Sequence, residues 1–301
     1  MTLLQRLRRL VKDPPPEFAF EISCEGLAWA EAERPAEARV LPLPEGTLQI
    51  NPAKPNFTDG GALAQALNAA VPLKPHPHQR LAVLALPDYC GRVSVLDFDS
   101  FPALSEEQIA LARFRVKRTV PFEIEDALVA CYPQARKDGS KKLDVVTVAI
   151  SREIAEQYLS PVRAAGFQCG LITVSGLAAL ALDDACADAP PQWIQVKRAG
   201  RVLTVCLVDR GTLRMFRCVE LDHATLDEML EVLAPTMAYA EDEFGARPAR
   251  LRLCGFAPQD PDGDILGAEL GLEVERVRSP FGAPGEANAG LLGLLTTLEV
   301  N

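Results

Sequence analysis

The sequence contains few of the residues that nucleophilic and metal-assisted catalysis require. Three histidines occur among 301 residues, and no Ser/His/Asp or Cys/His arrangement is recognisable, so nucleophilic catalysis is not indicated. The eight cysteines are scattered singly, without a CxxC pair, which argues against a zinc site. The phosphate-binding patterns GxGxxG and GxxxxGK[ST] are also absent. We therefore predict no catalytic and no metal-binding residues, and we expect most cysteines to be buried thiols in a reducing cytoplasm.

Long apolar runs and an excess of basic residues are missing as well. No run approaches the roughly 18 apolar residues that span a bilayer, and the leucines near the N-terminus are interleaved with arginines, unlike those of a signal peptide. A net charge of −10 argues against a general nucleic-acid binder, because phosphate neutralisation dominates such binding. The hydrophobic share of 48% and the charged share of 24% are typical of a soluble globular protein, and the length favours two lobes.

Residues 1–16 form a basic, amphipathic N-terminal segment. Its leucines recur at helical spacing, with basic side chains between them. Two interpretations stay open: a short helix that contacts an anionic membrane surface, and a terminal helix that packs on its own domain. Three prolines at 14–16 then form a stiff spacer.

The stretch 81–130 has the most specific pattern in the chain. An unbroken apolar run from residue 81 ends at Pro87 and suits a strand that is buried on both faces. Ser105 precedes two glutamates and a glutamine, which predicts a helix N-cap with a capping box. We expect this helix to end near Arg118, because Pro121 disfavours helical geometry in the residue before it.

Strands and helices are mixed along the whole chain. Hairpins occur together with strand–helix crossovers in two successive halves, and the second half begins near residue 175. This pattern predicts an α/β chain with mixed sheets. The expected strands are 18–22, 26–31, 81–86, 92–98, 125–132, 143–150, 169–174, 193–196, 201–208, 212–218, 251–254 and 273–277, and the expected helices are 62–70, 105–118, 152–165, 175–187, 224–244, 265–270 and 285–298.

The residues between 81 and 182 resemble a known family. The run LALP and the later stretch FPALSEEQIALARFRVKRTVPFEIEDALVACYP are similar to PilM, the actin-like protein of type IV pilus assembly. The similarity continues through VAISREIAEQYLSPVRAAGFQCGLITVSGLAALAL, and the cytoplasmic domain of the secretion protein GspL shares the family fold. The resemblance implies an actin-like (ribonuclease H-like) two-lobed α/β fold with mixed sheets. It places the first lobe at 17–174, with a small subdomain inserted at about 92–150, and the second lobe at 175–301.

The family fold also implies ATP and Mg²⁺ in a cleft between the lobes. Two Asp-x-Gly hairpins hold the phosphates and a Gly-Gly turn holds the adenosine, because glycine lets the backbone approach and aspartate positions Mg²⁺. All three loops are altered in this sequence. Glu21 stands where the first Asp would be and Ser23 replaces its Gly, the second hairpin carries Lys197 and Arg198, and the adenosine turn keeps one glycine, Gly255.

Two interpretations of the second hairpin are open. Lys197 and Arg198 could clamp a phosphate as point charges, or they could be solvated hairpin charges beside a cleft that no longer turns over ATP. Missing Mg²⁺ ligands favour the second interpretation, because Mg²⁺ supplies the main charge stabilisation in phosphoryl transfer. We therefore favour a protein without ATPase activity and without an ATP or Mg²⁺ cofactor, in which Gly255 is a remnant of the adenosine turn.

The resemblance implies a cytoplasmic scaffold at the inner membrane. Such a scaffold would bind the cytoplasmic tail of a bitopic inner-membrane protein similar to PilN, with the basic N-terminal helix at the membrane surface and self-association as a further expectation. We predict that Phe114, Arg118, Pro121 and Phe122 form an apolar groove with a basic edge for this partner, although a helix-face Phe usually packs inward. The alternatives are an ATP-binding actin-like ATPase and the cytoplasmic domain of a GspL-like type II secretion protein.

Overall fold

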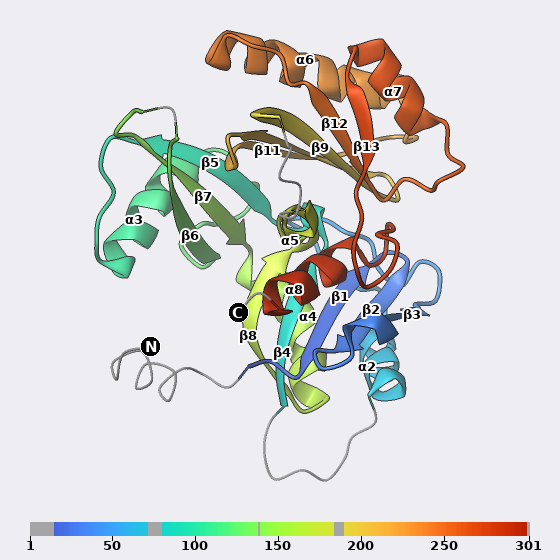
Figure 1. The fold of residues 1–301 in the computed structure, drawn as a ribbon. Helices are drawn as coiled ribbons and strands as arrows, with labels where there is room; N and C mark the ends of the chain where they lie inside the picture. Colours follow the sequence, from blue (N-terminus) through green and yellow to red (C-terminus); the bar gives the residue numbers. More distant parts are fainter. Residues whose placement is uncertain (1–14, 72–79, 138, 184–189, 300–301) are drawn as a thin grey trace, which may run out of the picture.

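The structure, a computed structural model, describes residues 15–71, 80–137, 139–183 and 190–299. The predicted N-terminal helix and the end of the predicted helix 175–187 lie outside these ranges. The strands form two five-stranded sheets and one three-stranded sheet. Each large sheet is the base of one lobe, and the small sheet stands to one side of both (Figure 1). In the described ranges no helix is long and apolar enough to cross a bilayer.

The sheet of the first lobe has the order β3-β2-β1-β4-β8, in which β1, β4 and β8 run parallel. The two faces of β1 bury different side chains, because side chains alternate along a strand. Phe18 and Phe20 lie in the large core, whereas Ala19 lies in a separate cluster with Leu291 and Leu292 of the C-terminal helix. The elements are β1 (Phe18–Ser23), β2 (Gly26–Glu31), β3 (Arg39–Pro42), β4 (Arg80–Leu86), β8 (Phe167–Val174), α2 (Gly60–Ala70), α4 (Arg152–Ala164) and the short η1 (Pro35–Glu37).

The C-terminal helix α8 (Ala289–Glu299) returns to the first lobe. It lies against β1, β4 and α5 (Ser175–Ala179), which continues as η3 (Leu180–Asp183) (Figure 1). Two glycines allow this contact, because a Cβ at Gly290 would come within 2.6 Å of Ser175 Oγ and a Cβ at Gly293 within 2.0 Å of the Ala178 carbonyl oxygen. Small residues on both sides therefore bring the start of α8 to the cleft end of β1.

The sheet of the second lobe has the order β11-β10-β9-β12-β13. Two helices pack on one face of it around Ile194, Leu203 and Met229, which form one buried cluster. The opposite face carries Trp193 and Cys206, which belong to the core of the first lobe, so this face is turned toward the cleft. The elements are β9 (Gln192–Ala199), β10 (Val202–Asp209), β11 (Thr212–Glu220), β12 (Arg250–Cys254), β13 (Glu273–Arg276), α6 (Leu226–Phe244) and α7 (Asp262–Leu270).

The inserted subdomain is an antiparallel sheet of order β5-β7-β6 with one helix, α3. Val116 of α3 is buried with Ile124, Ala127 and Ala149 in a small core of its own. Helix α3 covers one face of the sheet, and β11 of the second lobe lies beside β5 (Figure 1). The elements are β5 (Arg92–Phe98), α3 (Ser105–Val116), β6 (Leu128–Ala135) and β7 (Leu143–Ile150).

The predicted mixed α/β fold is confirmed, but several details are wrong. The strand β3 was not predicted, the helix predicted at 265–270 starts at Asp262, and the strand predicted at 193–196 extends to Ala199. Ser105 is the first helical residue, not the N-cap; the N-cap is Leu104, which makes no side-chain capping bond. The strand predicted at 125–132 starts at Leu128, because the residues just before it enter the small core under α3. The helix predicted from 175 is α-helical only to Ala179. The last helix starts at Ala289 because the side chain of Asn288 accepts a bond from the backbone of residue 285 in a preceding turn.

Candidate functional site

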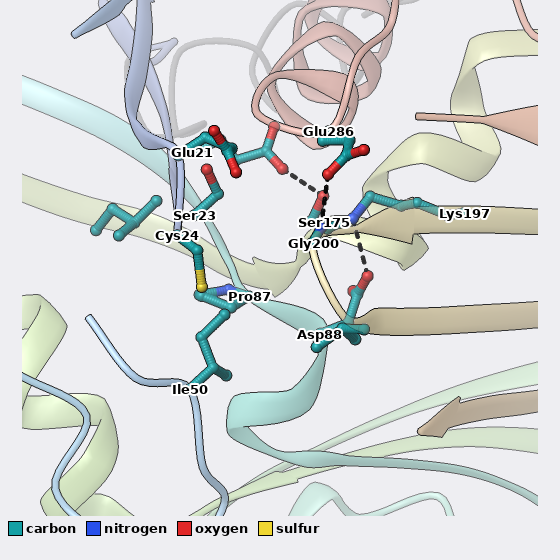
Figure 2. Close-up of a pocket in the computed structure, with 14 residues that line it drawn as sticks. Glu21, Ser23, Cys24, Ile50, Pro87, Asp88, Ser175, Lys197, Gly200 and Glu286 are labelled. Atoms are coloured by element: carbon teal, nitrogen blue, oxygen red, sulfur yellow. Dashed lines mark hydrogen bonds and ion pairs between the residues drawn. The ribbon is translucent and has the colours of Figure 1, made fainter. Parts of the chain in front are cut away.

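The cleft between the lobes contains a buried ion pair. The Nζ atom of Lys197, on β9, lies 3.0 Å from the Oδ2 atom of Asp88, which begins η2 (Asp88–Cys90) directly after β4. The two side chains are 3% and 1% exposed, and Figure 2 shows them pointing toward each other. Burial by itself lowers the pKa of Lys197, but the charges of Asp88 and Glu21 outweigh burial and raise it. Lys197 is therefore a cation at neutral pH, and the pair links the two lobes.

Asp88 also joins two further segments. It accepts a hydrogen bond from the backbone N–H of Gly176 at 2.5 Å and one from the hydroxyl of Thr204, on β10, at 2.9 Å. A Cβ at Gly176 would lie 3.0 Å from Asp88 Oδ1 and 2.9 Å from Thr204 Cγ2, so glycine is needed for this approach. These two hydrogen bonds and the bond from Lys197 offset the free-energy cost of removing the Asp88 carboxylate from water.

Glu21, the residue in the position of the family Asp, is also buried, at 1% exposure. It accepts a hydrogen bond from the Ser175 hydroxyl and another, at 2.8 Å, from the backbone N–H of Leu291 at the start of α8. Burial is the largest influence on its pKa and raises it above 4.5, although Lys197, Ser175 and Leu291 act in the opposite direction. Glu21 thus ties β1 to α5 and α8 inside the first lobe.

The raised pKa of Glu21 predicts a dependence of stability on pH. Between the unfolded pKa and the raised folded pKa the native state binds more protons than the unfolded state, so this contribution to stability falls as pH rises. We expect Glu21→Gln, which keeps the shape without the charge, to weaken the fall of the melting temperature as pH rises above the unfolded pKa of glutamate, and to raise the melting temperature at the upper end of that range. The matched control is Glu231→Gln on the exposed face of α6. An unchanged pH profile in Glu21→Gln would contradict the prediction.

The rim of the cleft is closed by Arg198. Its guanidinium lies 2.5 Å from Asp260 Oδ2 and 3.3 Å from Glu286 Oε1, and it stacks 4.7 Å from the ring centroid of Phe256. Glu286 also accepts from the backbone N–H of Gly200 at 2.6 Å. The interpretation of Lys197 and Arg198 as solvated charges is wrong, because both side chains are largely buried and paired with carboxylates of the protein itself.

The turn at Gly255, predicted to be a remnant of the adenosine turn, lies against the backbone of Arg198. Gly255 has φ +78°, and a Cβ there would lie 2.1 Å from the carbonyl oxygen of Arg198. The cavity that remains in the cleft has a volume of about 20 Å³ and is lined by Glu21, Asp88, Ser175, Lys197 and Glu286 among others (Figure 2). This space is about that of a single water molecule, and Glu21, Asp88, Lys197 and Glu286 bond protein atoms, so the cleft of this structure does not fit a Mg-nucleotide. Among the described residues no group of three or more metal-ligand side chains is assembled.

The cysteines around the cleft are free and mostly buried. Burial raises the pKa of Cys254 and of Cys218 to about 12. Cys90, Cys206 and Cys254 are buried, Cys131, Cys169 and Cys218 are half-buried, and Cys24 is exposed. The prediction of buried thiols is therefore confirmed at three of the described cysteines and is wrong at Cys24.

The residues predicted to bind a partner do not all line one groove. Phe114 projects from α3 at 77% exposure, so it does not pack inward. Pro121 and Phe122 line a shallow hollow with Lys117, Glu123 and Glu125 among its other residues, and neither Phe114 nor Arg118 belongs to that lining. Phe122 is half-buried against the small core. The role of these four residues stays a prediction.

A larger apolar groove lies between the subdomain and the first lobe. Its volume is about 720 Å³. One wall is the face of the β6–β7 sheet that α3 does not cover, and the other is β8 with α5. Tyr132 is 70% and Leu171 47% exposed on these two walls. The lining residues are Leu128, Val129, Ala130, Cys131, Tyr132, Gln134, Val146, Val148, Ile150, Leu171, Ile172, Thr173, Leu177, Leu180 and Leu213.

The sequence did not predict this groove, because its walls come from distant segments. The strand predicted at 143–150, which contributes Val146, Val148 and Ile150, is confirmed. Nothing local indicates that this strand faces β8, which is separated from it by a whole helix. Apolar side chains on an uncovered sheet face are the one available signal.

The chain matches no protein-family model and no curated protein sequence. Solved structures with the same architecture are similar over most of their length. The PilM–PilN type IV pilus biogenesis complex matches with a TM-score of 0.70 at 17% identity, covering 95% of this chain and 99% of that chain. The cytoplasmic domain of EpsL, an inner-membrane component of the Vibrio cholerae type II secretion system, matches at 0.50 and 14% identity, covering 94% of each.

A third structure, a Bacteroides thetaiotaomicron protein with an actin-like ATPase fold, matches at 0.50 and 12% identity over 93% of this chain and 95% of that one. These similarities define the class of the fold, and the predicted actin-like fold is confirmed. The structure of this chain resembles the PilM chain more than the other two by TM-score.

Proposed function

We propose that the protein is a scaffold of type IV pilus or related secretion machinery. Its apolar groove between β6–β7 and β8 would bind the cytoplasmic tail of a bitopic membrane protein, without turning over ATP. The observation that carries the proposal is this groove, in a chain similar to one whose complex with PilN has been solved. The basic N-terminal segment would hold the scaffold at the inner leaflet.

The shape of the groove suits an extended peptide. β8 contributes three consecutive residues, Leu171, Ile172 and Thr173, and consecutive residues point to opposite faces, so β8 presents its edge. Within the described sheet β4 is its one neighbour, which leaves backbone groups of β8 available for pairing. A tail could add to this edge as a strand, the mode in which main-chain bonds give affinity and side-chain pockets give specificity.

The opposite wall would select the side chains of the tail. Val146 and Ile150 are buried at its base, and Leu128, Tyr132 and Val148 are at least partly exposed on it, so alternate apolar residues of a tail would pack against these three. The edge of β6 is a poorer template than that of β8, because Pro133 lies within β6 and has no N–H to donate. A tail of about eight residues, at roughly 3.3 Å each, would match the length of the strands.

The cleft supports the absence of ATP turnover. Lys197 and Arg198 are paired with carboxylates of the protein itself, and aspartates that would position Mg²⁺ are missing from both hairpins. Removing the metal ligands removes the main electrostatic contribution to phosphoryl transfer. This part of the proposal is independent of the groove.

The groove is tested by tail binding. The probe is a fluorescein-labelled peptide of the cytoplasmic N-terminus of the PilN-like protein from the same genome, titrated with wild type, Leu171→Asp and Phe114→Asp. We expect Leu171→Asp to weaken binding by about tenfold or more, because a charge would enter the buried centre of the interface. Phe114→Asp, at a more exposed apolar position outside the groove, should bind as wild type does.

A loss in Phe114→Asp with normal binding by Leu171→Asp would instead favour the surface predicted around Phe114, Arg118, Pro121 and Phe122. No binding by wild type would overturn the tail-binding function itself. Circular dichroism of each variant verifies that it is folded.

The nucleotide is tested by thermal unfolding with and without millimolar Mg-ATP. A ligand at 100 times its Kd stabilises by about 2.7 kcal/mol, which would raise the melting temperature by several degrees. We expect no change. A clear rise would favour the alternative, an ATP-binding actin-like ATPase.

A further inference from the structure

The groove is built from parts that belong to both lobes. Its walls are the subdomain and β8 of the first lobe, and Leu213 of β11 brings the second lobe into its lining. The width of the groove therefore depends on how these three parts are held together.

The chain connects the subdomain to the first lobe at one crossing, and beside this crossing Val146 and Ile150 of β7 pack into the large core of the first lobe. The chain enters it after η2 and leaves it at the end of β7. The two segments touch at Gly91, where a Cβ would lie 2.6 Å from Ile150 Cγ1 and 2.8 Å from the Ala149 carbonyl oxygen. Because both connections lie at the same point, the subdomain can rotate about this point relative to the first lobe, as domains rotate about a hinge.

The far side of the subdomain is held by the second lobe. Gln134 of β6 exchanges two hydrogen bonds with the backbone of Leu213, at 3.0 and 3.1 Å. Asp144 of β7, 3% exposed, lies 3.0 Å from the guanidinium of Arg214 and also bonds Arg136 at 2.7 Å. The orientation of the subdomain thus follows that of the second lobe.

The second lobe is in turn held to the first by the Asp88–Lys197 pair and by the bond from Thr204 to Asp88. Asp88 lies three residues before the crossing at Gly91. The links form a closed chain: first lobe, Asp88–Lys197, second lobe, Arg214–Asp144, subdomain, and back to the first lobe through the crossing.

We propose that the buried Asp88–Lys197 pair is a positioning device for the groove: it fixes the angle between the lobes and thereby the distance from the β6–β7 sheet to β8. The proposal rests on the proposed tail-binding function. An actin-like cleft closed by residues of the protein itself would keep the groove in one shape without a nucleotide. Lys197 and Asp88 do not touch the tail, so they act as positioning residues.

The test uses variants that remove the ion pair of each link. Asp88→Asn with Lys197→Met removes both charges of the first pair, and replacing a buried pair by neutral groups of similar volume is tolerated. Arg214→Met with Asp209→Asn removes the ion pair of the second link without leaving Asp209 buried and unpaired, and Asp144 stays bonded to Arg136. The control, Glu241→Gln with Arg247→Met, removes an exposed pair at the end of α6.

The measurement is the affinity of the labelled PilN-like tail peptide, below the melting temperature of every variant. We expect each link variant to bind about tenfold more weakly, the scale on which residues in a coupling network act, and the control to bind as wild type does. The links act in series, so combining both link variants should weaken binding little beyond either. Small-angle X-ray scattering should show a larger radius of gyration for Asp88→Asn/Lys197→Met.

Wild-type affinity in folded Asp88→Asn/Lys197→Met would overturn the positioning role, and so would strictly additive losses. If that variant fails to fold, Arg214→Met/Asp209→Asn by itself decides between the same two results. Failure of wild type to bind the peptide would instead overturn the proposed function, so the two failures are distinguishable.

Discussion

Lys197→Met as a single substitution is expected to lower the free energy of unfolding by about 3–5 kcal/mol, because it leaves Asp88 buried without its cationic partner. Asp88 is 1% exposed in the pair, and its remaining donors are a backbone N–H and a hydroxyl. The desolvation cost of the carboxylate is then no longer offset by a charge. Urea unfolding followed by circular dichroism measures the loss.

The double variant Asp88→Asn/Lys197→Met is the control for this prediction. It keeps the side-chain volumes but has no charge to desolvate, so most of the lost stability should return. A single variant as stable as wild type would show that the pair contributes nothing. A double variant no more stable than Lys197→Met would show that the lysine acts by packing and not by its charge.

Gly293→Ala is expected to cost about 3 kcal/mol, the upper part of the range for overpacking. The added Cβ would lie 2.0 Å from the carbonyl oxygen of Ala178 and 2.5 Å from its carbonyl carbon. Both atoms belong to the backbone of α5, so no side chain can rotate away, and α8 must move off the first lobe. Displacing α8 would also loosen the bond from the Leu291 N–H to Glu21.

The matched control for Gly293→Ala is Gly60→Ala, also at a glycine within a helix. A Cβ at Gly60 meets no atom within 4 Å, so this variant should be as stable as wild type or slightly more stable. Thermal unfolding compares the two, and about 3 kcal/mol corresponds to a drop of several degrees in a chain of this size. Equal melting temperatures would contradict the close α5–α8 contact.

The local elements could be predicted because their signals are local. The alternation in β1 and the apolar run of β4 specify strands whatever lies around them. Gly245 and Gly271, both in the left-handed conformation, end their helices as expected. The prediction of Ser105 as the N-cap was wrong because a capping box requires the helix to begin at the residue after the serine. Here Ser105 is itself the first helical residue, so the helix begins one residue earlier.

The candidate site could be predicted only in its outline. The altered nucleotide loops were visible at Glu21, Lys197 and Arg198, and the missing Asp-x-Gly hairpins indicated an unusual cleft. The partner of Lys197 was not visible, because Asp88 is 109 residues away. A lysine in a hairpin is solvated unless a distant carboxylate is buried beside it.

The sequence by itself determined the strands and helices, the actin-like order in which they follow one another, and the departure of the nucleotide loops from their family pattern. Tertiary structure decided what fills the cleft and where the apolar groove lies. The bond from Leu291 to Glu21 spans 270 residues, and β7 faces β8 only because the subdomain folds back beside the first lobe. Pairings of this kind depend on the order of strands in the sheets and on burial, and no local sequence pattern contains this information. The free-energy costs of desolvation and of closing long loops arise only when distant segments come together in the folded chain.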